Sequence, residues 1–219
     1  MTFEEIETWI RSWAAQGKTV FATSSFQTHS LPMLHMLSRI DRTIPIVFLD
    51  TGYHFSETIE FRNRVARQFD LNLVNVVPQV SKINQRDESG RLYFTSNPEL
   101  CCYLNKVQPL EPFLERYDVW VTGIRAGQKD NRRALQTFVE GPHECRRFHP
   151  VLDWTVAMIH DYLREYNLPV HPLDAFGYQS IGCEPCTAPP ESSDGRSGRW
   201  IGQHKTECGL HTDLANKNP

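Results

Sequence analysis

The sequence predicts an α/β protein in which helices flank a parallel sheet. Strand-like and helix-like patterns alternate over residues 2–122, and this alternation is typical of a parallel sheet covered by helices. The composition, 40% hydrophobic and 22% charged, is close to that of globular domains. The length of 219 residues suits one domain with an appended segment. We therefore expect an α/β domain over residues 1–168 and an extended C-terminal arm over residues 169–219.

The predicted elements follow one another in a regular order. A capping box of Thr2 and Glu5 begins an amphipathic helix over residues 2–16. The next elements are a strand at residues 19–22, a helix marked by Leu31, Leu34, Leu37 and Ile40, a strand at residues 44–49, a helix marked by Phe61, Val65 and Phe69, a strand at residues 71–77, a helix opened by Pro98, and a strand at residues 119–122.

The remainder of the chain has weaker patterns. Residues 124–150 are polar, basic and irregular, so no regular element is predicted there. Asp153 is expected to cap a helix that runs to Tyr166. From Pro169 onward Gly, Pro and Ser dominate, which predicts an arm with little core of its own.

Charge and hydropathy exclude several classes of function. The net charge of −3 leaves no global basic excess for nucleic acid or an anionic membrane. The first residues lack the pattern of a signal peptide, and no apolar run approaches the roughly 18 residues of a membrane span. We therefore expect a soluble, cytoplasmic protein that binds neither nucleic acid nor membrane. In that setting the six cysteines are better explained as metal ligands or a reactive thiol than as disulfides.

Two loops follow predicted strands at the edge where ligands bind in parallel sheets. These are residues 24–30 and the turn formed by Asp50, Thr51 and Gly52. Loops at this edge present backbone N–H groups and helix N-termini to anions. Neither loop matches a Walker or Rossmann fingerprint, so each is equally compatible with an ordinary strand-to-helix connection.

The cysteine spacing is more specific. Cys101 and Cys102 are followed, after 80 residues, by Cys183 and Cys186, which offers four thiolates for a zinc ion or an iron–sulfur cluster. Neighbouring side chains on one helix point about 100 degrees apart, an arrangement that zinc sites built from two C-x-x-C pairs avoid. The adjacent pair therefore favours iron–sulfur over zinc.

The C-terminal arm carries two further features. Cys208 has Lys205 three positions before it and His211 three after it, and such neighbours favour the nucleophilic thiolate. Arg196 and Arg199 are flanked by glycines and are able to fold over a phosphate or sulfate. The alternative for the two arginines is a solvated basic turn.

These motifs together closely resemble assimilatory adenylyl-sulfate reductases. The resemblance lies in residues 177–187, 196–200 and 205–211, and covers roughly residues 18–211. The cysteine pair with Lys106, the turn at residues 49–52 and the segment at residues 122–125 also resemble family motifs in the expected order. The resemblance implies an adenine nucleotide α-hydrolase-like (PP-loop-like) fold, with a nucleotide-binding reductase domain followed by the arm.

The resemblance also implies a reaction in assimilatory sulfate reduction, on the way to cysteine. Cys208 would attack the sulfur of adenosine 5′-phosphosulfate (APS), expel AMP and form an S-sulfocysteine, from which thioredoxin or a similar dithiol releases sulfite. Cys101, Cys102, Cys183 and Cys186 would ligate a 4Fe-4S cluster that does not carry the reducing electrons. Substrate contacts are implied for Ser24, Ser25, Phe26, Leu49, Asp50, Thr51, Gly52, Lys106, Arg125, Arg196, Arg199 and His211.

The chain departs from the family at one loop, and some roles stay open. Family members often carry a glycine and acidic residues after Ser-Phe, whereas this chain has Gln27, Thr28, His29 and Ser30. Arg132 and Arg133 are further candidates for substrate contact, and the local match does not choose between them. Cys145 has no family role and is interpreted as a structural or incidental thiol.

Two alternatives compete with the APS hypothesis. The first is a reductase for the 3′-phosphorylated substrate, PAPS, or for both substrates; the paired cysteines favour APS, because members restricted to PAPS lack them. The second is a nucleotide-binding module with a structural zinc, in which Cys208 has no catalytic role. Purified without oxygen, that module would be colourless and contain zinc, whereas a cluster protein would be brown.

Overall fold

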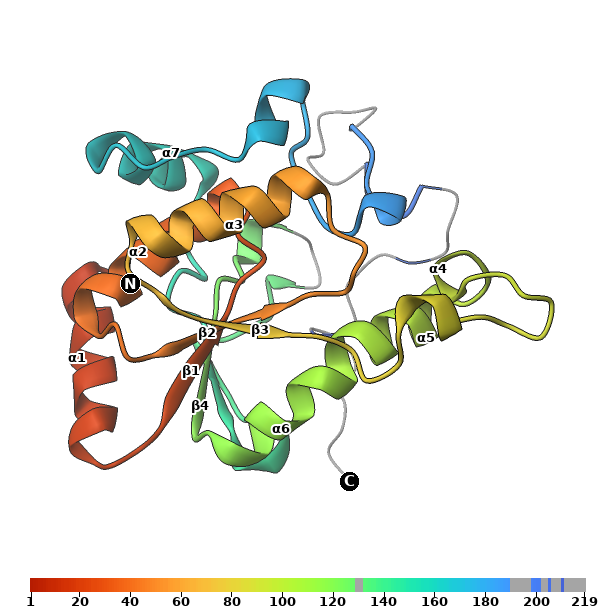
Figure 1. Ribbon diagram of the computed structural model, residues 1–219. Coiled ribbons are helices and arrows are strands. Elements are labelled where there is room, and N and C mark those ends of the chain that lie inside the picture. The colour runs from red at the N-terminus through yellow and green to blue at the C-terminus, as the bar shows by residue number, and fades with distance from the viewer. Residues whose placement is uncertain (129–131, 190–197, 202–204, 206–209, 211–219) are drawn as a thin grey trace.

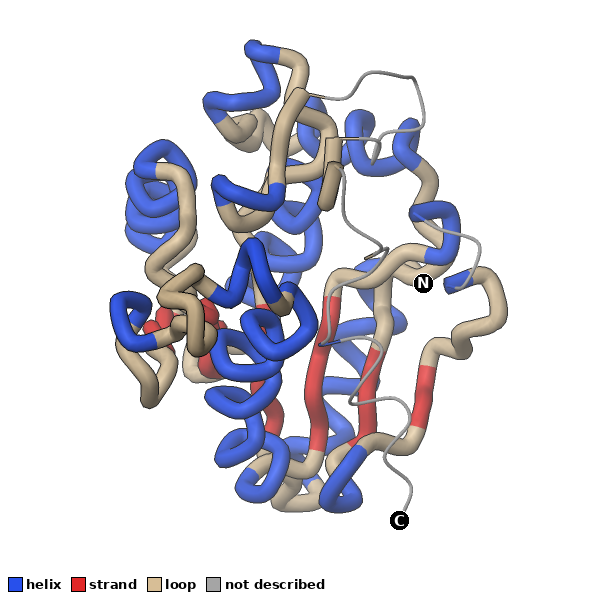
Figure 2. The backbone as a smooth tube through the Cα atoms, turned by 90° about the vertical axis from the view of Figure 1, so that its right-hand side faces the viewer, coloured by secondary structure: helices blue, strands red, loops and turns tan. Residues whose placement is uncertain are grey.

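A six-stranded sheet lies at the centre of the computed structural model, with helices on both faces (Figure 1). The structure describes residues 1–128, 132–189, 198–201, 205 and 210. The described strands are β1 (Val20–Thr23), β2 (Pro45–Leu49), β3 (Asn72–Val76), β4 (Val119–Thr122), β5 (Phe138–Val139) and β6 (Arg146–Phe148). Figure 2 shows the strands side by side, with loops and short helices gathered beyond one end of them.

The strand order is β3-β2-β1-β4-β6-β5. All neighbours are parallel except β5, which pairs antiparallel to β6. From β1 the chain continues to β2 on one side, whereas from β4 it continues toward β6 on the other. The order therefore reverses between β1 and β4, and the carboxyl ends of these two strands form the crevice where open α/β sheets bind ligands.

The four predicted strands are confirmed, but the expectation of an irregular segment over residues 124–150 is wrong, because β5 and β6 lie within it. Strand β6 has no apolar pattern in the sequence, because two of its three residues are Arg146 and Arg147. One of them, Arg147, is only 3% exposed and lies 5.3 Å from the centroid of the Trp120 ring. A charged residue interrupts the apolar pattern expected of a buried strand, although its side chain is buried here against an aromatic ring.

The helices follow the predicted order, with three differences. The helices are α1 (Phe3–Ala15), α2 (Leu31–Ile40), α3 (Ser56–Gln68), α4 (Tyr93–Ser96), α5 (Pro98–Cys102), α6 (Gln108–Arg116) and α7 (Val156–Glu165). The first difference is the short helix α4, which was not predicted. The predicted helix after Pro98 is divided, since a π-helical segment, Tyr103–Val107, joins α5 to α6. The cap of α7 is Thr155 rather than Asp153, which instead forms an ion pair with the N-terminal amino group.

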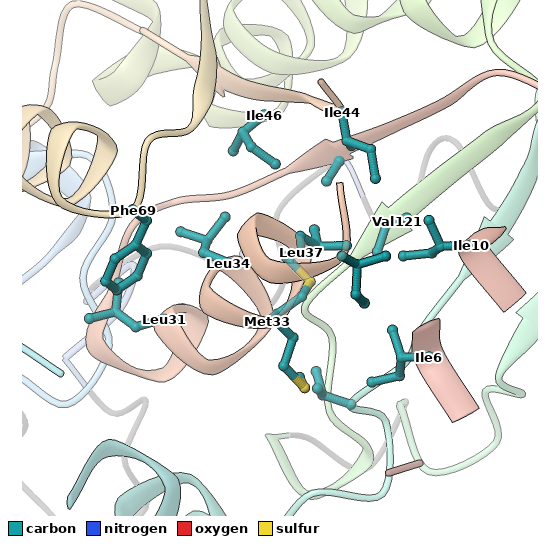
Figure 3. Close-up of a cluster of buried hydrophobic side chains, with 14 of the residues drawn as sticks. Ile6, Ile10, Leu31, Met33, Leu34, Leu37, Ile44, Ile46, Phe69 and Val121 are labelled. Atoms are coloured by element: carbon teal, nitrogen blue, oxygen red, sulfur yellow. The ribbon is translucent and has the colours of Figure 1, made fainter. Parts of the chain in front are cut away.

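Each face of the sheet buries its own apolar cluster. On one face α1, α2 and α3 cover the sheet, as the side chains of Ile6, Leu34 and Ile46 illustrate (Figure 3), and α7 packs against α2 in the same apolar cluster. On the other face α6 packs Leu110 and Leu114 against the strands. Full burial of such side chains contributes about 1.5–3 kcal/mol each, so helices on both sides hold the sheet in place.

The segment after α7 is bound to the domain by a buried polar network. His171, which is completely buried, donates its backbone N–H to Thr28 Oγ1 at 2.8 Å, and Thr28 Oγ1 donates to Asp174 at 2.5 Å. The His171 ring contacts Thr58 of α3 at 3.0 Å. His171 and Asp174 therefore attach this segment to the loop after β1 and to α3. The division at residue 168 stays a prediction.

Candidate functional site

A cavity of about 770 Å³ opens at the carboxyl ends of β1, β2 and β4. The loop after β1 contributes Ser24 and Ser25, the end of β2 contributes Leu49, and the loop after β4 contributes Arg125. Residues 177–183 of the arm form the opposite wall. The cavity therefore lies at the crevice between β1 and β4, and its size suits a nucleotide-sized ligand.

Several residues predicted to contact substrate line this cavity. They are Ser24, Ser25, Leu49, Lys106, Arg125 and Arg199. Thr51 instead borders a smaller pocket, described below, and Asp50 and Gly52 line neither. Arg196, Cys208 and His211 lie outside the described residues. The substrate role of each residue stays a prediction.

Phe26 has a place that the sequence did not indicate. Its ring is completely buried and packs 5.9 Å from the ring of Phe48, so it belongs to the core rather than to the cavity wall. Its backbone has a φ of 54°, an uncommon value for a residue with a side chain. Its backbone N–H donates to Ser24 Oγ at 3.0 Å. The buried ring thus anchors the loop that brings the two serines to the cavity.

Two buried guanidinium groups line the cavity after β4. Arg125 is 4% exposed and Arg132 is 6% exposed. Burial, and then the charge of Arg132, lowers the pKa of Arg125, and Arg125 Nε has no hydrogen-bond partner among the described residues. Two buried like charges are costly without an anion to neutralise them. Of the two arginines that the sequence left open, Arg132 lines the cavity, whereas Arg133 is exposed and does not. Which of them contacts substrate stays a prediction.

Two polar residues that the sequence did not single out hold these arginines. His29 Nδ1 lies 3.1 Å from Arg125 Nη2. Burial, followed by the charges of Arg125 and His160, lowers the pKa of His29 to about 4, so the ring is neutral and accepts from the guanidinium. Gln128 accepts from both Arg132 and the backbone N–H of Arg125. The approach of His29 to Arg125 depends on β1 and β4 being neighbours, which no local sequence pattern reveals.

A second pocket gathers the four predicted ligand cysteines. Cys101, Cys102, Cys183 and Cys186 all line it, and the free space between them is about 10 Å³. Burial, followed by the nearness of Cys183 and Cys186, raises the pKa of the Cys101 thiol to about 11. In the part of the chain that the structure describes, no three His, Cys, Asp or Glu side chains form a site for a single metal ion.

The turn after β2 brings the arm cysteines to the helix cysteines. Cys183 pairs with His54 in an antiparallel bridge, and the next residue, Glu184, donates its N–H to Tyr53 O at 2.7 Å. Thr51 Oγ1 lies 3.3 Å from Cys183 Sγ. The pocket thus joins three segments that are distant in sequence.

The two pockets share a wall. Lys106, Cys183 and Trp200 line both of them. Any ligand in the large cavity would therefore lie beside the cysteine pocket, with an ammonium group at the boundary. The remaining described cysteine, Cys145, lines neither pocket and is completely buried, which raises the pKa of its thiol to about 12. Complete burial outside both pockets is consistent with the prediction that Cys145 is a structural thiol.

The fold and the site define a class: an α/β protein with a nucleotide-sized, arginine-lined cavity next to four clustered thiols. Residues 19–189 match the phosphoadenosine phosphosulfate reductase domain, and the chain belongs to that family. It is 42% identical over 194 residues to an adenosine 5′-phosphosulfate reductase of Mesorhizobium japonicum, with 88% of this chain and 76% of that protein aligned.

A second relative and a solved structure agree with this family. The chain is 37% identical over 209 residues to an adenosine 5′-phosphosulfate reductase of Bacillus cereus, with 92% of this chain and 88% of that protein aligned. The crystal structure of phosphoadenylyl-sulfate (PAPS) reductase from Candida auris superimposes with a TM-score of 0.71 at 24% identity, covering 83% of this chain and 89% of that one. The predicted PP-loop-like α/β fold is confirmed.

Proposed function

We propose that the protein reduces adenosine 5′-phosphosulfate to sulfite and AMP, with thioredoxin or a similar dithiol as reductant, in assimilatory sulfate reduction. The main support is the wall shared by the arginine-lined cavity and the cysteine pocket, because it would bring an anionic nucleotide beside the clustered thiols. The relatives named adenosine 5′-phosphosulfate reductase support the same substrate.

The arginines have a defined task in this reaction. A phosphosulfate is a dianion, and a thiolate must approach it, so cationic groups have to neutralise both the phosphate and the sulfate. Arg125 and Arg132 are buried and held by side-chain partners before substrate arrives. Such preorganisation avoids reorientation during the reaction. Lys106, at the shared wall, would add a charge on the cysteine side.

The proposed chemistry has two steps at Cys208. In the first, the thiolate attacks the sulfate sulfur; an S–S bond forms, the S–O bond to the phosphate breaks, and AMP leaves with the electron pair. In the second, a thiolate of the dithiol attacks Cys208 Sγ, sulfite leaves, and the second thiol closes a disulfide in the dithiol as Cys208 is released. The two reducing electrons therefore come from the dithiol.

The cysteine pocket fits a 4Fe-4S cluster chemically. A cluster takes one thiolate at each of four irons, and four cysteines line this pocket. Donors lie near the sulfurs at Thr51 and Asn105. The pocket would have to widen, since 10 Å³ is about the room of one water. When bound, the cluster would supply an electrostatic field beside the sulfate.

The described cysteines also support a reducing, cytoplasmic location. None of the five described cysteines, which are Cys101, Cys102, Cys145, Cys183 and Cys186, forms a disulfide. Disulfides are rare in the cytosol, whereas thiols and iron–sulfur ligands are common there. No helix in the described part of the chain is long and apolar enough to cross a membrane.

Sulfite release and metal analysis test this function. Anaerobically purified protein should be brown, contain about four irons per chain, and release sulfite from APS when thioredoxin is present. Equal rates with PAPS would establish a dual reductase, and release from PAPS alone would overturn the APS assignment. Colourless protein with zinc and no sulfite release would favour a nucleotide-binding module instead.

Mass spectrometry tests the role of Cys208. Protein mixed with APS and no reductant should gain a sulfonate on the peptide that contains Cys208, and thioredoxin should remove it. The Cys208→Ser variant should keep its iron and bind nucleotide, but form neither adduct nor sulfite. An adduct on Cys145, or undiminished sulfite formation by the variant, would refute this assignment.

A further inference from the structure

A pair of buried amides lies beside the cysteine pocket. Gln85 is completely buried and comes from the loop between β3 and α4, and Asn105 is 2% exposed and lies in the π-helical segment after the cysteine pair. Gln85 Nε2 donates to Asn105 Oδ1 at 3.0 Å, and Asn105 Nδ2 donates to Gln85 Oε1 at 2.6 Å. Two reciprocal hydrogen bonds therefore join the side chains.

The orientation of both amides is fixed by a backbone carbonyl. Gln85 Nε2 also lies 2.8 Å from the carbonyl oxygen of Val80, which only accepts, so the NH₂ group of Gln85 must face that oxygen. The same NH₂ group then meets the oxygen of Asn105, and the oxygen of Gln85 meets the NH₂ group of Asn105. Turning either amide over would place like groups against each other.

This fixed orientation directs a donor at Cys101. The NH₂ group of Asn105 carries two hydrogens. One is donated to Gln85 Oε1, and the other is shared between the Cys101 carbonyl oxygen at 2.7 Å and Cys101 Sγ at 3.6 Å. Were the amide reversed, its oxygen lone pairs would face the sulfur of a deprotonated ligand. The π-helical segment that carries Asn105 is a local departure from α-helix, and such departures are frequent at functional sites.

We propose that Asn105 is a positioning residue that holds an N–H donor against the sulfur of Cys101, and that Gln85 fixes its orientation. This inference rests on the proposed 4Fe-4S cluster. A hydrogen bond to a ligand sulfur stabilises the more negative, reduced form of a cluster and so raises its reduction potential. The Gln85–Asn105 pair thereby connects the loop after β3 to the electronic properties of the site.

Substitutions at the pair test the proposal through the reduction potential. We expect a shift to lower potential in Asn105→Leu, a smaller shift in Gln85→Leu, and a shift in the double variant no larger than in Asn105→Leu alone, since Gln85 acts through Asn105. Each single variant leaves the other side-chain amide without its partner, which can destabilise the fold. The double variant removes both amides, so a shift in its potential cannot be attributed to an unpaired buried amide. The Fe–S stretching bands should move in the same variants.

Gln108→Leu is a matched control. It removes an amide three residues further along the same helical run, and Gln108 lines neither pocket. Iron content and circular dichroism should match wild type in all variants used for the comparison. Potentials and Fe–S bands unchanged in Asn105→Leu and in the double variant would overturn the proposal while leaving the cluster in place. Wild-type protein without iron would overturn the cluster assignment, and the role of Asn105 with it.

Discussion

The ammonium group of Lys205 forms an ion pair with the carboxylate of Glu99, across 106 positions of sequence. Glu99 lies in α5, two residues before the cysteine pair, and the Lys205 side chain is only 3% exposed. Further along the arm, Leu210 packs against the apolar cluster beneath α6. Two described residues of the arm therefore contact the domain, Lys205 at α5 and Leu210 at the cluster of α6. The charge of Lys205, which the sequence assigned to favouring the Cys208 thiolate, is engaged by Glu99.

We expect Glu99→Gln to slow formation of the Cys208 adduct by about two- to fivefold. One partner of the ion pair is 65% exposed, so the pair contributes only about 0.5–1 kcal/mol. Stopped-flow mixing with APS, quenched for mass spectrometry, measures the rate. The exchanged pair Glu99→Lys with Lys205→Glu should recover most of it. An unchanged rate in Glu99→Gln would show that the ion pair does not hold the arm for attack.

We expect that Cys145 neither reacts as a nucleophile nor binds iron. Because burial raises the pKa of its thiol to about 12, it stays protonated at neutral pH and should resist alkylation in the folded protein. Cys145→Ser should therefore retain its iron, whereas Cys183→Ser should lose it. Metal analysis of the two variants and alkylation mapping of wild type provide the measurement. Equal loss of iron in both would contradict the separation of the two sites.

The local elements could be predicted from sequence, but their convergence could not. Strand β2 is a continuous apolar run, and helix α1 has a capping box and helical spacing of its apolar residues. Both patterns are local and can be recognised without knowledge of the tertiary structure. Strand β6 escaped prediction because Arg147 is buried by its contact with Trp120, which belongs to a strand that is distant in sequence. Tertiary contacts of this kind override local propensity.

The candidate site shows the same limit. The four cysteines could be grouped from their spacing as candidate cluster ligands, because thiolates are the usual ligands of iron–sulfur clusters. His29 and Gln128 were not, because each is defined only by the arginine that it holds in space. Likewise, Arg132 and Arg133 are equivalent in sequence and differ only in which one faces the cavity.

Acid should destabilise the fold through His171. Its pKa is lowered to about 4, mainly by burial, with Arg64 lowering and Glu57 raising it, whereas the unfolded value is near 6.5. Between these values the unfolded chain binds a proton that the native ring does not. The free energy of unfolding should therefore fall as pH drops from 6.5 toward 4, by roughly 1 kcal/mol per pH unit from this residue.

Urea unfolding at pH 5, 6 and 7 measures this dependence. His29 and His149 have similarly lowered pKa values, so wild type should lose stability steeply in this range. His171→Gln should start from lower stability, since its contact with Thr58 is altered, but its slope against pH should be shallower. Parallel slopes for the two proteins would mean that folding does not lower the pKa of His171.

Gly182 controls the position of Arg199. A Cβ atom at residue 182 would lie 2.6 Å from Arg199 Cζ, well inside van der Waals contact, so a side chain there must displace the guanidinium. Arg199 is held by Cys186 O at 3.2 Å and by the face of the Trp200 ring at 4.4 Å. These contacts place it at the wall of the large cavity, beside Trp200, where we expect it to contact the charged end of the nucleotide.

We expect Gly182→Ala to reduce kcat/KM for APS by about tenfold or more, as expected from losing a hydrogen bond to a charged group worth about 1.5–3 kcal/mol. Arg199→Ala should cause a similar loss, with iron content unchanged in both variants. The deciding comparison is the double variant. With the guanidinium already removed, the added methyl group has nothing to displace, so Gly182→Ala should have almost no effect in the Arg199→Ala background. Additive losses would show that residue 182 acts through the neighbouring Cys183 rather than through Arg199.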